Sequence, residues 1–284
     1  MVELKDFKPT KKFFIGVDSD GTAFDSMTIK HTDSFIPMIF EIWGMEEHRE
    51  LIVELEELIN LYSKLRGINR FPGLLFLFEE LEKRGIWHKN LDAFRTFCTS
   101  GKKMSNASLA EFMAENDDEL LKEVMEWSKG ADELFSKGTA DLKPFPAVAS
   151  ALKAASEYAD IVIVSSAAAK GLKDDWENGG LLQYVTCLCG QEAGSKKEQL
   201  KAAADGRYDK DKILMLGDAV GDMEAADSIE ALYYPIMPKS ENDCWVNLEK
   251  EGLAKFFDGT YKGAYEEELR AKFDACLPEY SPEK

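Results

Sequence analysis

The sequence lacks any long apolar run. No stretch approaches the roughly 20 apolar residues that cross a bilayer, which argues against a membrane-spanning protein. The first residues, Met1 to Asp6, mix charges and show no apolar segment of the kind found in signal peptides. We therefore expect a cytoplasmic protein that uses no membrane as a partner.

Cysteine and histidine are scarce. The five cysteines are scattered, and all three histidines fall between positions 31 and 88, so no Cys/His cluster has the spacing of a zinc site. Cys187 and Cys189 lie two apart in an apolar run and are expected on one side of a strand. We interpret them as buried, reduced thiols.

Positive charge is also in short supply. The chain has 35 Lys and Arg against 53 Asp and Glu, a formal net charge of −18. Such a field repels nucleic acid, so nucleic acid is not an expected partner. It also repels a phosphate ester, and an anionic substrate would need local positive charge at its site.

The apolar pattern predicts an α/β core interrupted by a helical lobe. Phe13-Phe14-Ile15-Gly16-Val17 is typical of a buried parallel strand. Beyond Pro144 further strands, expected at 161–164, 184–189, 213–216 and 231–236, alternate with helices, which indicates a Rossmann-like parallel sheet covered on both faces. Between them, helical periodicity predicts six helices, at 28–43, 47–65, 73–84, 89–98, 105–115 and 117–135. The predicted domains are 1–26 with 142–284 for the core and 27–141 for the lobe.

Polar residues follow the first strand in the run Asp18-Ser19-Asp20-Gly21-Thr22. Ligands of open α/β sheets bind at the carboxyl ends of the strands. Gly21 permits the turn that would point Asp18 and Asp20 into one crevice. One carboxylate could then attack phosphorus while the other handles the proton. The alternative is a solvated acidic turn.

Two weaker signals follow later strands. Ser165 and Ser166 come after the second strand, where a hydroxyl and free amides suit a phosphate oxygen, although an ordinary helix N-cap explains them too. Ser195-Lys196-Lys197 opens a predicted helix, and one of its lysines could balance anionic charge. The sequence does not decide between Lys196 and Lys197, and a surface lysine would also explain either.

Two more carboxylates, Asp218 and Asp222, lie four apart after the strand at 213–216. They form a hard-oxygen site suited to Mg²⁺, while an acidic helix cap would account for one of them. With Asp18 and Asp20 they would crowd one pocket, where like charges about 4 Å apart repel by roughly 4 kcal/mol at an effective dielectric near 20. One lysine cannot neutralise four carboxylates, whereas a divalent cation can.

These elements, in this order, resemble the haloacid dehalogenase superfamily of phosphotransferases over residues 13–26 and about 142–236. The helical insertion after Thr22-Ala23-Phe24-Asp25-Ser26 is similar to the phosphoglycolate phosphatase and β-phosphoglucomutase branch, although this cap is larger than is common there. The resemblance implies a sheet ordered 5-4-1-2-3 and an aspartyl-phosphate at Asp18. It also implies that Asp20 is the acid–base residue and that Ser165 and Lys196 hold the phosphoryl group. Mg²⁺ would be bound by the Asp18 side chain, the Asp20 carbonyl and Asp218, with Asp222 bound directly or through water.

The expected activity is hydrolysis of a small-molecule phosphate monoester. Ser166 and Thr22 are further candidates for substrate binding. In the lobe, Leu58 to Phe78 contains no acid, and Arg70 is a candidate contact for an anionic substrate, with a basic helix end as the alternative. A phosphomutase is the main rival reading, and a non-catalytic binding protein on the same fold is a third. The sequence leaves the oligomeric state open.

Overall fold

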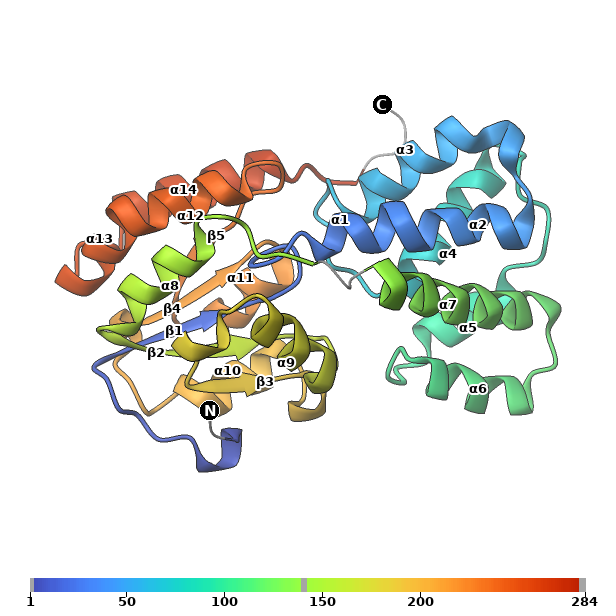
Figure 1. Ribbon diagram of the computed structural model, residues 1–284. Helices are drawn as coiled ribbons and strands as arrows, with labels where there is room; N and C mark the ends of the chain where they lie inside the picture. Colours follow the sequence, from blue (N-terminus) through green and yellow to red (C-terminus); the bar gives the residue numbers. More distant parts are fainter. Residues whose placement is uncertain (1–2, 139–141, 281–284) are drawn as a thin grey trace. The chain divides into compact units, whose positions relative to one another are not determined.

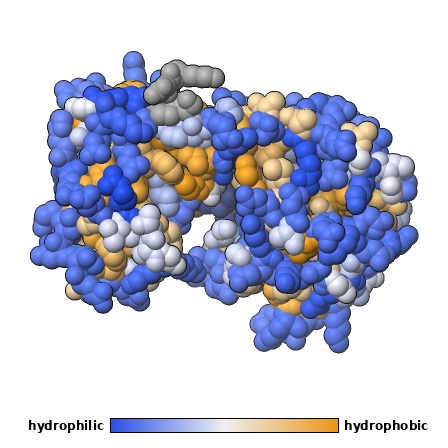
Figure 2. All heavy atoms as spheres, turned by 180° about the vertical axis from the view of Figure 1, so that it is seen from behind, coloured by the Kyte–Doolittle hydropathy of each residue, from blue (hydrophilic) through white to orange (hydrophobic). Residues whose placement is uncertain are grey.

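A computed structural model describes residues 3–138 and 142–280. Within them the chain forms two compact units (Figure 1). The α/β unit comprises residues 3–26 and 142–277, and the helical unit comprises residues 27–138 and 278–280. Hydrophilic residues cover most of the face that Figure 2 shows of each unit. None of the helices described is both long and apolar enough to cross a membrane.

The α/β unit is built on a five-stranded parallel sheet. Its strands are β1 (Phe13–Val17), β2 (Ala159–Val164), β3 (Cys187–Cys189), β4 (Ile213–Gly217) and β5 (Leu232–Pro235). Their order is β3-β2-β1-β4-β5, which is the predicted order read from the other edge. β1, β2, β4 and β5 are buried along their whole length, as near-continuous apolar runs in a parallel sheet require. The α/β prediction is therefore confirmed.

Helices cover both faces of the sheet because alternate strand residues point to opposite sides. Phe13, Ile15 and Val17 pack with one apolar cluster, and Phe14 packs with another. The first face is covered by α8 (Val148–Ser156), α9 (Ala169–Asn178), α12 (Glu241–Asn247) and α13 (Leu253–Asp258). The second is covered by α10 (Lys196–Ala204) and α11 (Val220–Asp227), while α14 (Ala264–Cys276) packs beside the edge strand β5 and contributes to both clusters.

The helical unit has its own apolar core of buried Leu, Ile, Phe and Trp side chains. Its α-helices are α1 (Ser26–Lys30), which begins one residue before the unit, α2 (Ile36–Trp43), α3 (Arg49–Asn60), α4 (Arg70–Lys83), α5 (Asp92–Thr99), α6 (Asn106–Glu115) and α7 (Glu119–Gly138). A π-helix (His31–Phe35) joins the first two.

Several helix boundaries in the helical unit differ from the expected ones, and those of α3 and α4 frame the segment that holds Pro72 and Gly73. α3 ends at Asn60 instead of residue 65, and α4 begins at Arg70 instead of residue 73. Asn69 caps α4 by accepting a hydrogen bond from the Phe71 amide. Pro72 therefore lies in the first turn, where a helix tolerates proline because those amides have no intrahelical partner. The Pro72-Gly73 pair does not interrupt the helix.

Residues 278–280, predicted to belong to the α/β core, pack in the helical unit. The Lys64 amide donates a hydrogen bond to the Pro278 carbonyl at 3.0 Å, and Lys64 Nζ lies 2.8 Å from Glu279 Oε1. The Tyr280 ring packs on the Phe76 ring with centroids 6.1 Å apart. We call residues 278–280 the C-terminal strap.

Candidate active site

The chain turns sharply after β1. The Asp18 amide donates to the Leu216 carbonyl of β4, and the Ser19 carbonyl then accepts the amides of Thr22, Ala23 and Phe24. Gly21 adopts φ 76°, a left-handed conformation that costs glycine little. This local turn leaves the Asp18 side chain at the carboxyl end of the central strand.

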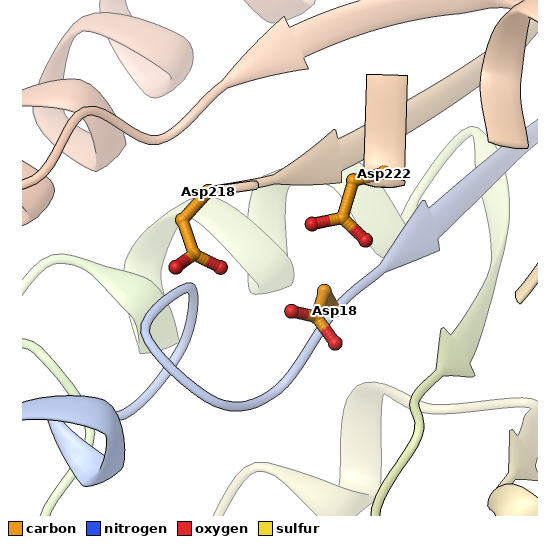
Figure 3. Close-up of side chains that lie close together, drawn as sticks. All are labelled: Asp18, Asp218 and Asp222. Atoms are coloured by element: carbon orange, nitrogen blue, oxygen red, sulfur yellow. The ribbon is translucent and has the colours of Figure 1, made fainter. Parts of the chain in front are cut away.

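Three aspartates from two neighbouring strand ends meet at this edge of the sheet (Figure 3). A carboxylate oxygen from each of Asp18, Asp218 and Asp222 lies within 4.8 Å of the others. All three side chains are buried, with at most 3% of each residue exposed. Asp222 lies in the first turn of α11, and its Oδ2 accepts the Ala219 amide at 3.2 Å. β1 and β4 are adjacent parallel strands, which explains why the two acidic motifs converge.

Lys196 is the lysine that enters this cluster. Its Nζ lies 3.0 Å from Asp18 Oδ1 and 2.6 Å from Asp222 Oδ1. Lys197, one residue on, is half-exposed and pairs with Glu224 at 3.1 Å. Ser195 forms a capping box with Glu198, which fixes the start of α10 and hence the direction of the Lys196 side chain.

Burial and like charge set the protonation behaviour of the cluster. Burial raises the pKa of Asp18 well above its usual range, Lys196 opposes that rise, and Asp222, Asp218 and Asp20 add to it. Burial also raises the pKa of Asp222. For Lys196 burial acts to lower the pKa, but the facing carboxylates of Asp18 and Asp222 outweigh it and raise the pKa. Two of the three carboxyl groups, those of Asp18 and Asp222, therefore hold their protons more tightly than exposed carboxyl groups do.

This donor set fits a hard divalent cation. Carboxylate oxygens are the ligands that Mg²⁺ takes from proteins, and one or two carboxylates with a substrate phosphate usually complete its shell. The oxygens of the cluster are close enough to share one ion. Such an ion would favour the charged forms of Asp18 and Asp222, the two aspartates whose pKa values are raised.

The side chains of Asp20 and Thr22 each form a hydrogen bond with a neighbouring side chain. Ser26 Oγ donates a hydrogen bond to Asp20 Oδ1. Thr22, a candidate for substrate binding, is fully buried, and its Oγ1 donates to Asp218 Oδ1 at 2.7 Å. The observed contact of Thr22 is thus one that orients a predicted metal ligand.

The serines after β2 differ in exposure. Ser165 is buried, and its Oγ accepts the Ala167 amide at 3.1 Å, whereas Ser166 is exposed. The Ser165 backbone is held on both sides by Gln199, whose Oε1 accepts the Ser165 amide and whose Nε2 donates to the Ser165 carbonyl. Gln199 also donates to the carbonyls of Gly190 and Gly194.

Sequence reasoning missed Gln199 and two tryptophans that fix the turn after β1. Trp176 Nε1 donates to Ser19 Oγ at 2.9 Å, and Trp245 Nε1 donates to the Thr22 carbonyl at 2.7 Å. All three side chains are fully buried. In the sequence, Gln199, Trp176 and Trp245 occupy positions typical of ordinary core residues of helices. The one available signal was the polar side chain of Gln199 at a position where the helical pattern predicts an apolar residue.

Arg70 belongs to the helical unit and is bound there to its own neighbours. Its Nη1 lies 2.6 Å from Asp132 Oδ1 and donates to Ser128 Oγ and the Ser128 carbonyl. Its guanidinium also lies over the Phe35 ring, 5.0 Å from the centroid. Arg70 is the first residue of α4, where a cation does not balance the helix dipole. Its role in substrate binding stays a prediction.

The chain is similar to several solved structures. One is a haloacid dehalogenase-like family hydrolase from Streptococcus pneumoniae, with 15% identity over 87% of this chain and 100% of that chain, and a TM-score of 0.47. Another is a HAD-superfamily hydrolase of subfamily IA from Geobacter sulfurreducens, with 14% identity over 80% and 88% and a TM-score of 0.43. A predicted phosphatase from Clostridium acetobutylicum shows 15% identity over 86% and 100%, with a TM-score of 0.45.

No protein-family model and no curated protein matches the chain. Two of the three solved structures are described as haloacid dehalogenase-type hydrolases. At 14–15% identity these neighbours do not carry an activity or a substrate over to this chain.

Proposed function

We propose that this protein is a Mg²⁺-dependent phosphatase of the haloacid dehalogenase type, which hydrolyses small-molecule phosphate monoesters through an aspartyl-phosphate at Asp18. The observation that carries the proposal is the buried cluster of Asp18, Asp218 and Asp222 with Lys196 hydrogen-bonded inside it. A merely structural acidic cap would not need three carboxylates and a lysine desolvated together, because each buried charge costs free energy.

Asp18 is the proposed nucleophile. One of its carboxylate oxygens attacks phosphorus, the bond from phosphorus to the ester oxygen breaks, and Asp20 gives its proton to the departing alkoxide. In the second half, Asp20 takes a proton from water as the water oxygen attacks the phosphorus of the aspartyl-phosphate. The bond to Asp18 breaks, inorganic phosphate leaves, and both carboxyl groups return to their starting states.

The remaining residues hold charge. Lys196, whose Nζ lies beside Asp18, is proposed to bind one oxygen of the transferring group, and Ser165 is proposed to bind another. Asp18, Asp218, Asp222 and the Asp20 carbonyl would hold Mg²⁺, which supplies neutralising charge for the phosphoryl group when bound. Ser166 and Arg70 are retained as proposed substrate contacts, and Arg70→Ala is expected to raise KM.

The test is release of inorganic phosphate from a panel of phosphate esters with Mg²⁺ and with EDTA. We expect turnover only with Mg²⁺, and none for Asp18→Asn. Lys196→Met should lower kcat by about 100-fold or more, as loss of a charge that stabilises a transition state does. The neighbouring substitution Lys197→Met, which removes the same charge outside the cluster, should stay within about twofold.

Equal turnover in EDTA, or an active Asp18→Asn protein, would contradict the proposal. Conversion of a sugar phosphate into its isomer without release of free phosphate would show that the protein is a phosphomutase and not a phosphatase. Both outcomes are read from one set of reactions by ³¹P NMR, because the isomeric esters and inorganic phosphate give separate signals.

A further inference from the structure

A basic pocket lies at the amino edge of the sheet in the α/β unit. It has a volume of about 430 Å³ and is lined by Lys11, Lys12, Gly206, Arg207, Tyr208, Asp209 and Lys212. Lys11 and Lys12 come directly before β1, and Lys212 comes directly before β4. These strands are parallel neighbours, so their amino ends lie side by side.

The pocket is separate from the acidic cluster. The aspartates follow the carboxyl ends of β1 and β4, and the basic residues precede the amino ends of the same strands. Five residues of parallel strand span roughly 16 Å. A ligand in the basic pocket would therefore not touch Asp18 or Lys196.

The lysines and the arginine of the pocket contact mainly uncharged groups. Lys11 Nζ donates to the Glu157 carbonyl at 3.2 Å, and Arg207 Nη1 donates to the Phe7 carbonyl at 2.6 Å. Lys12 Nζ lies over the Phe13 ring, 5.4 Å from its centroid. Asp209 is the one carboxylate among the lining residues; it pairs with Lys212 and also interacts with the charge of Lys12. The lining thus carries four cationic side chains against one carboxylate, which leaves positive charge that an anion could bind.

This concentration of cations is unusual in a chain of net charge −18. The overall field repels anions, so a small anion is held only where local charge exceeds it. Lys11, Lys12 and Arg207 are exposed and can reach a ligand. Asp209 and the buried Asp160 offset only part of the charge of the four cationic side chains, which repel one another, and a bound anion relieves that repulsion.

A buried carboxylate makes the pocket rigid. Asp160, with 1% of its surface exposed, accepts the Thr10 and Lys11 amides on Oδ2 at 2.8 and 2.9 Å. The same oxygen accepts the Tyr208 hydroxyl at 2.7 Å. Asp160 therefore ties the segment before β1 to the segment before β4. Walls fixed in this way lower the entropy lost when a ligand binds.

We propose that this pocket binds a small anion with several adjacent negative charges, of the polyphosphate type. A single phosphate would meet only part of the cationic surface, whereas a chain of phosphates can contact Lys11, Lys12 and Arg207 at once. A volume of about 430 Å³ lies within the usual range of small-ligand sites. Longer polyanions such as nucleic acid are disfavoured because they extend over the acidic surface beyond the pocket.

The test is a titration of the metal-free protein with tripolyphosphate, followed through backbone-amide NMR shifts. EDTA removes the cation that would bring phosphates to the acidic cluster. We expect saturable shifts at residues 11–12 and 206–212, with small shifts at residues 18–22 and 218–222. Affinity should fall as ionic strength rises. Adenosine triphosphate should produce shifts at the same amides, since it carries the same phosphate chain.

The variant Lys11→Gln/Lys12→Gln/Arg207→Gln should weaken binding by at least about tenfold. The matched variant Lys153→Gln/Lys250→Gln/Lys262→Gln removes three exposed charges elsewhere in the same unit and should bind within about twofold. Equal affinity in the two triple variants, or shifts centred on the acidic cluster, would overturn the proposal. Because the readout is binding without metal, its failure is distinct from failure of the proposed phosphatase.

Discussion

Thr22 Oγ1 donates a hydrogen bond to Asp218 Oδ1 across 2.7 Å, and so joins the loop after β1 to the loop after β4. Both residues are buried, and they lie 196 positions apart in the chain. The bond leaves Asp218 with a fixed orientation toward Asp18. Groups that orient a metal ligand in this way commonly change metal affinity when they are removed.

Thr22→Val keeps the shape of the side chain and removes the hydroxyl. We expect the Mg²⁺ concentration for half-maximal activity to rise about tenfold or more, because Asp218 loses a donor that fixes it. The measurement is phosphate release against Mg²⁺ concentration. Thr96→Val is the control, since it removes an exposed hydroxyl bonded only within α5. An unchanged Mg²⁺ dependence of Thr22→Val would show that Asp218 needs no such support.

Replacing Asp18 by Asn should stabilise the metal-free protein at neutral and alkaline pH. Burial raises the pKa of Asp18, so the folded state holds its proton more tightly than the unfolded state does. The stability that this group contributes is present in full below its unfolded pKa and is lost as pH rises through the raised folded value. The amide of the variant does not titrate, so its advantage over the wild type grows with pH.

This prediction is checked by thermal unfolding in EDTA between pH 4 and pH 8. We expect a gain of roughly 1 kcal/mol at pH 8 that shrinks toward pH 4. Added Mg²⁺ should stabilise the wild type more than Asp18→Asn, since binding to the folded state raises its stability. A variant less stable than the wild type at pH 8 would mean that the Asp18–Lys196 ion pair outweighs the cost of burial.

Gly217 is the last residue of β4, and the Asp222 side chain fills the space that a side chain at position 217 would need. A Cβ at position 217 would overlap the Asp222 side chain. Gly217→Ala should therefore cost about 1–3 kcal/mol of unfolding free energy and displace Asp222 from Lys196. Activity should fall with stability, and both are measured on one preparation.

Gly171 is the matched control for this substitution. It lies inside α9, and an added Cβ would meet nothing within 4 Å. Gly171→Ala should stabilise the protein by roughly 0.5–1 kcal/mol, because alanine restricts the unfolded chain more than glycine does. If the two substitutions had equal effects, crowding by Asp222 would not be the cause.

Tyr280 of the C-terminal strap should contribute through its ring and not through its hydroxyl. The ring packs on Phe76, and the buried hydroxyl oxygen has no hydrogen-bond partner within the part of the chain that the structure describes. Tyr280→Ala should cost about 1–3 kcal/mol, and Tyr280→Phe should be neutral or slightly stabilising. Hydrogen exchange of the α4 amides measures this locally. Faster exchange in Tyr280→Phe would reveal a partner for the hydroxyl.

Much of the α/β unit could be predicted from its sequence because its strands are short, apolar and bounded by polar residues. Asp18 and Asp218 end neighbouring strands, so a parallel sheet alone requires them to converge. The choice between Lys196 and Lys197 could not be predicted. It depends on the rotation of α10 about its axis, and Gln199 and the Ser195 cap set that rotation through contacts made only in the folded chain.

The helical unit was predicted less well for a different reason. The effect of a proline or glycine on a helix depends on its position. Pro72 is tolerated because α4, capped by Asn69, begins at Arg70, three residues before the predicted start at residue 73. The contacts of Arg70 with Asp132 and Ser128 join helices far apart in sequence, and no local pattern encodes them. The return of residues 278–280 to this unit is equally non-local.

The strap makes the helical unit discontinuous in sequence. A domain graft that transferred residues 27–141 alone would leave behind Pro278 and Glu279, which bond to Lys64, and the Tyr280 ring that covers Phe76. The transplanted helices would then expose the apolar surface around Phe76, which Tyr280 covers in the intact chain. Anyone exchanging this lobe between proteins would need to carry residues 278–280 with it, or to replace Phe76 by a polar side chain.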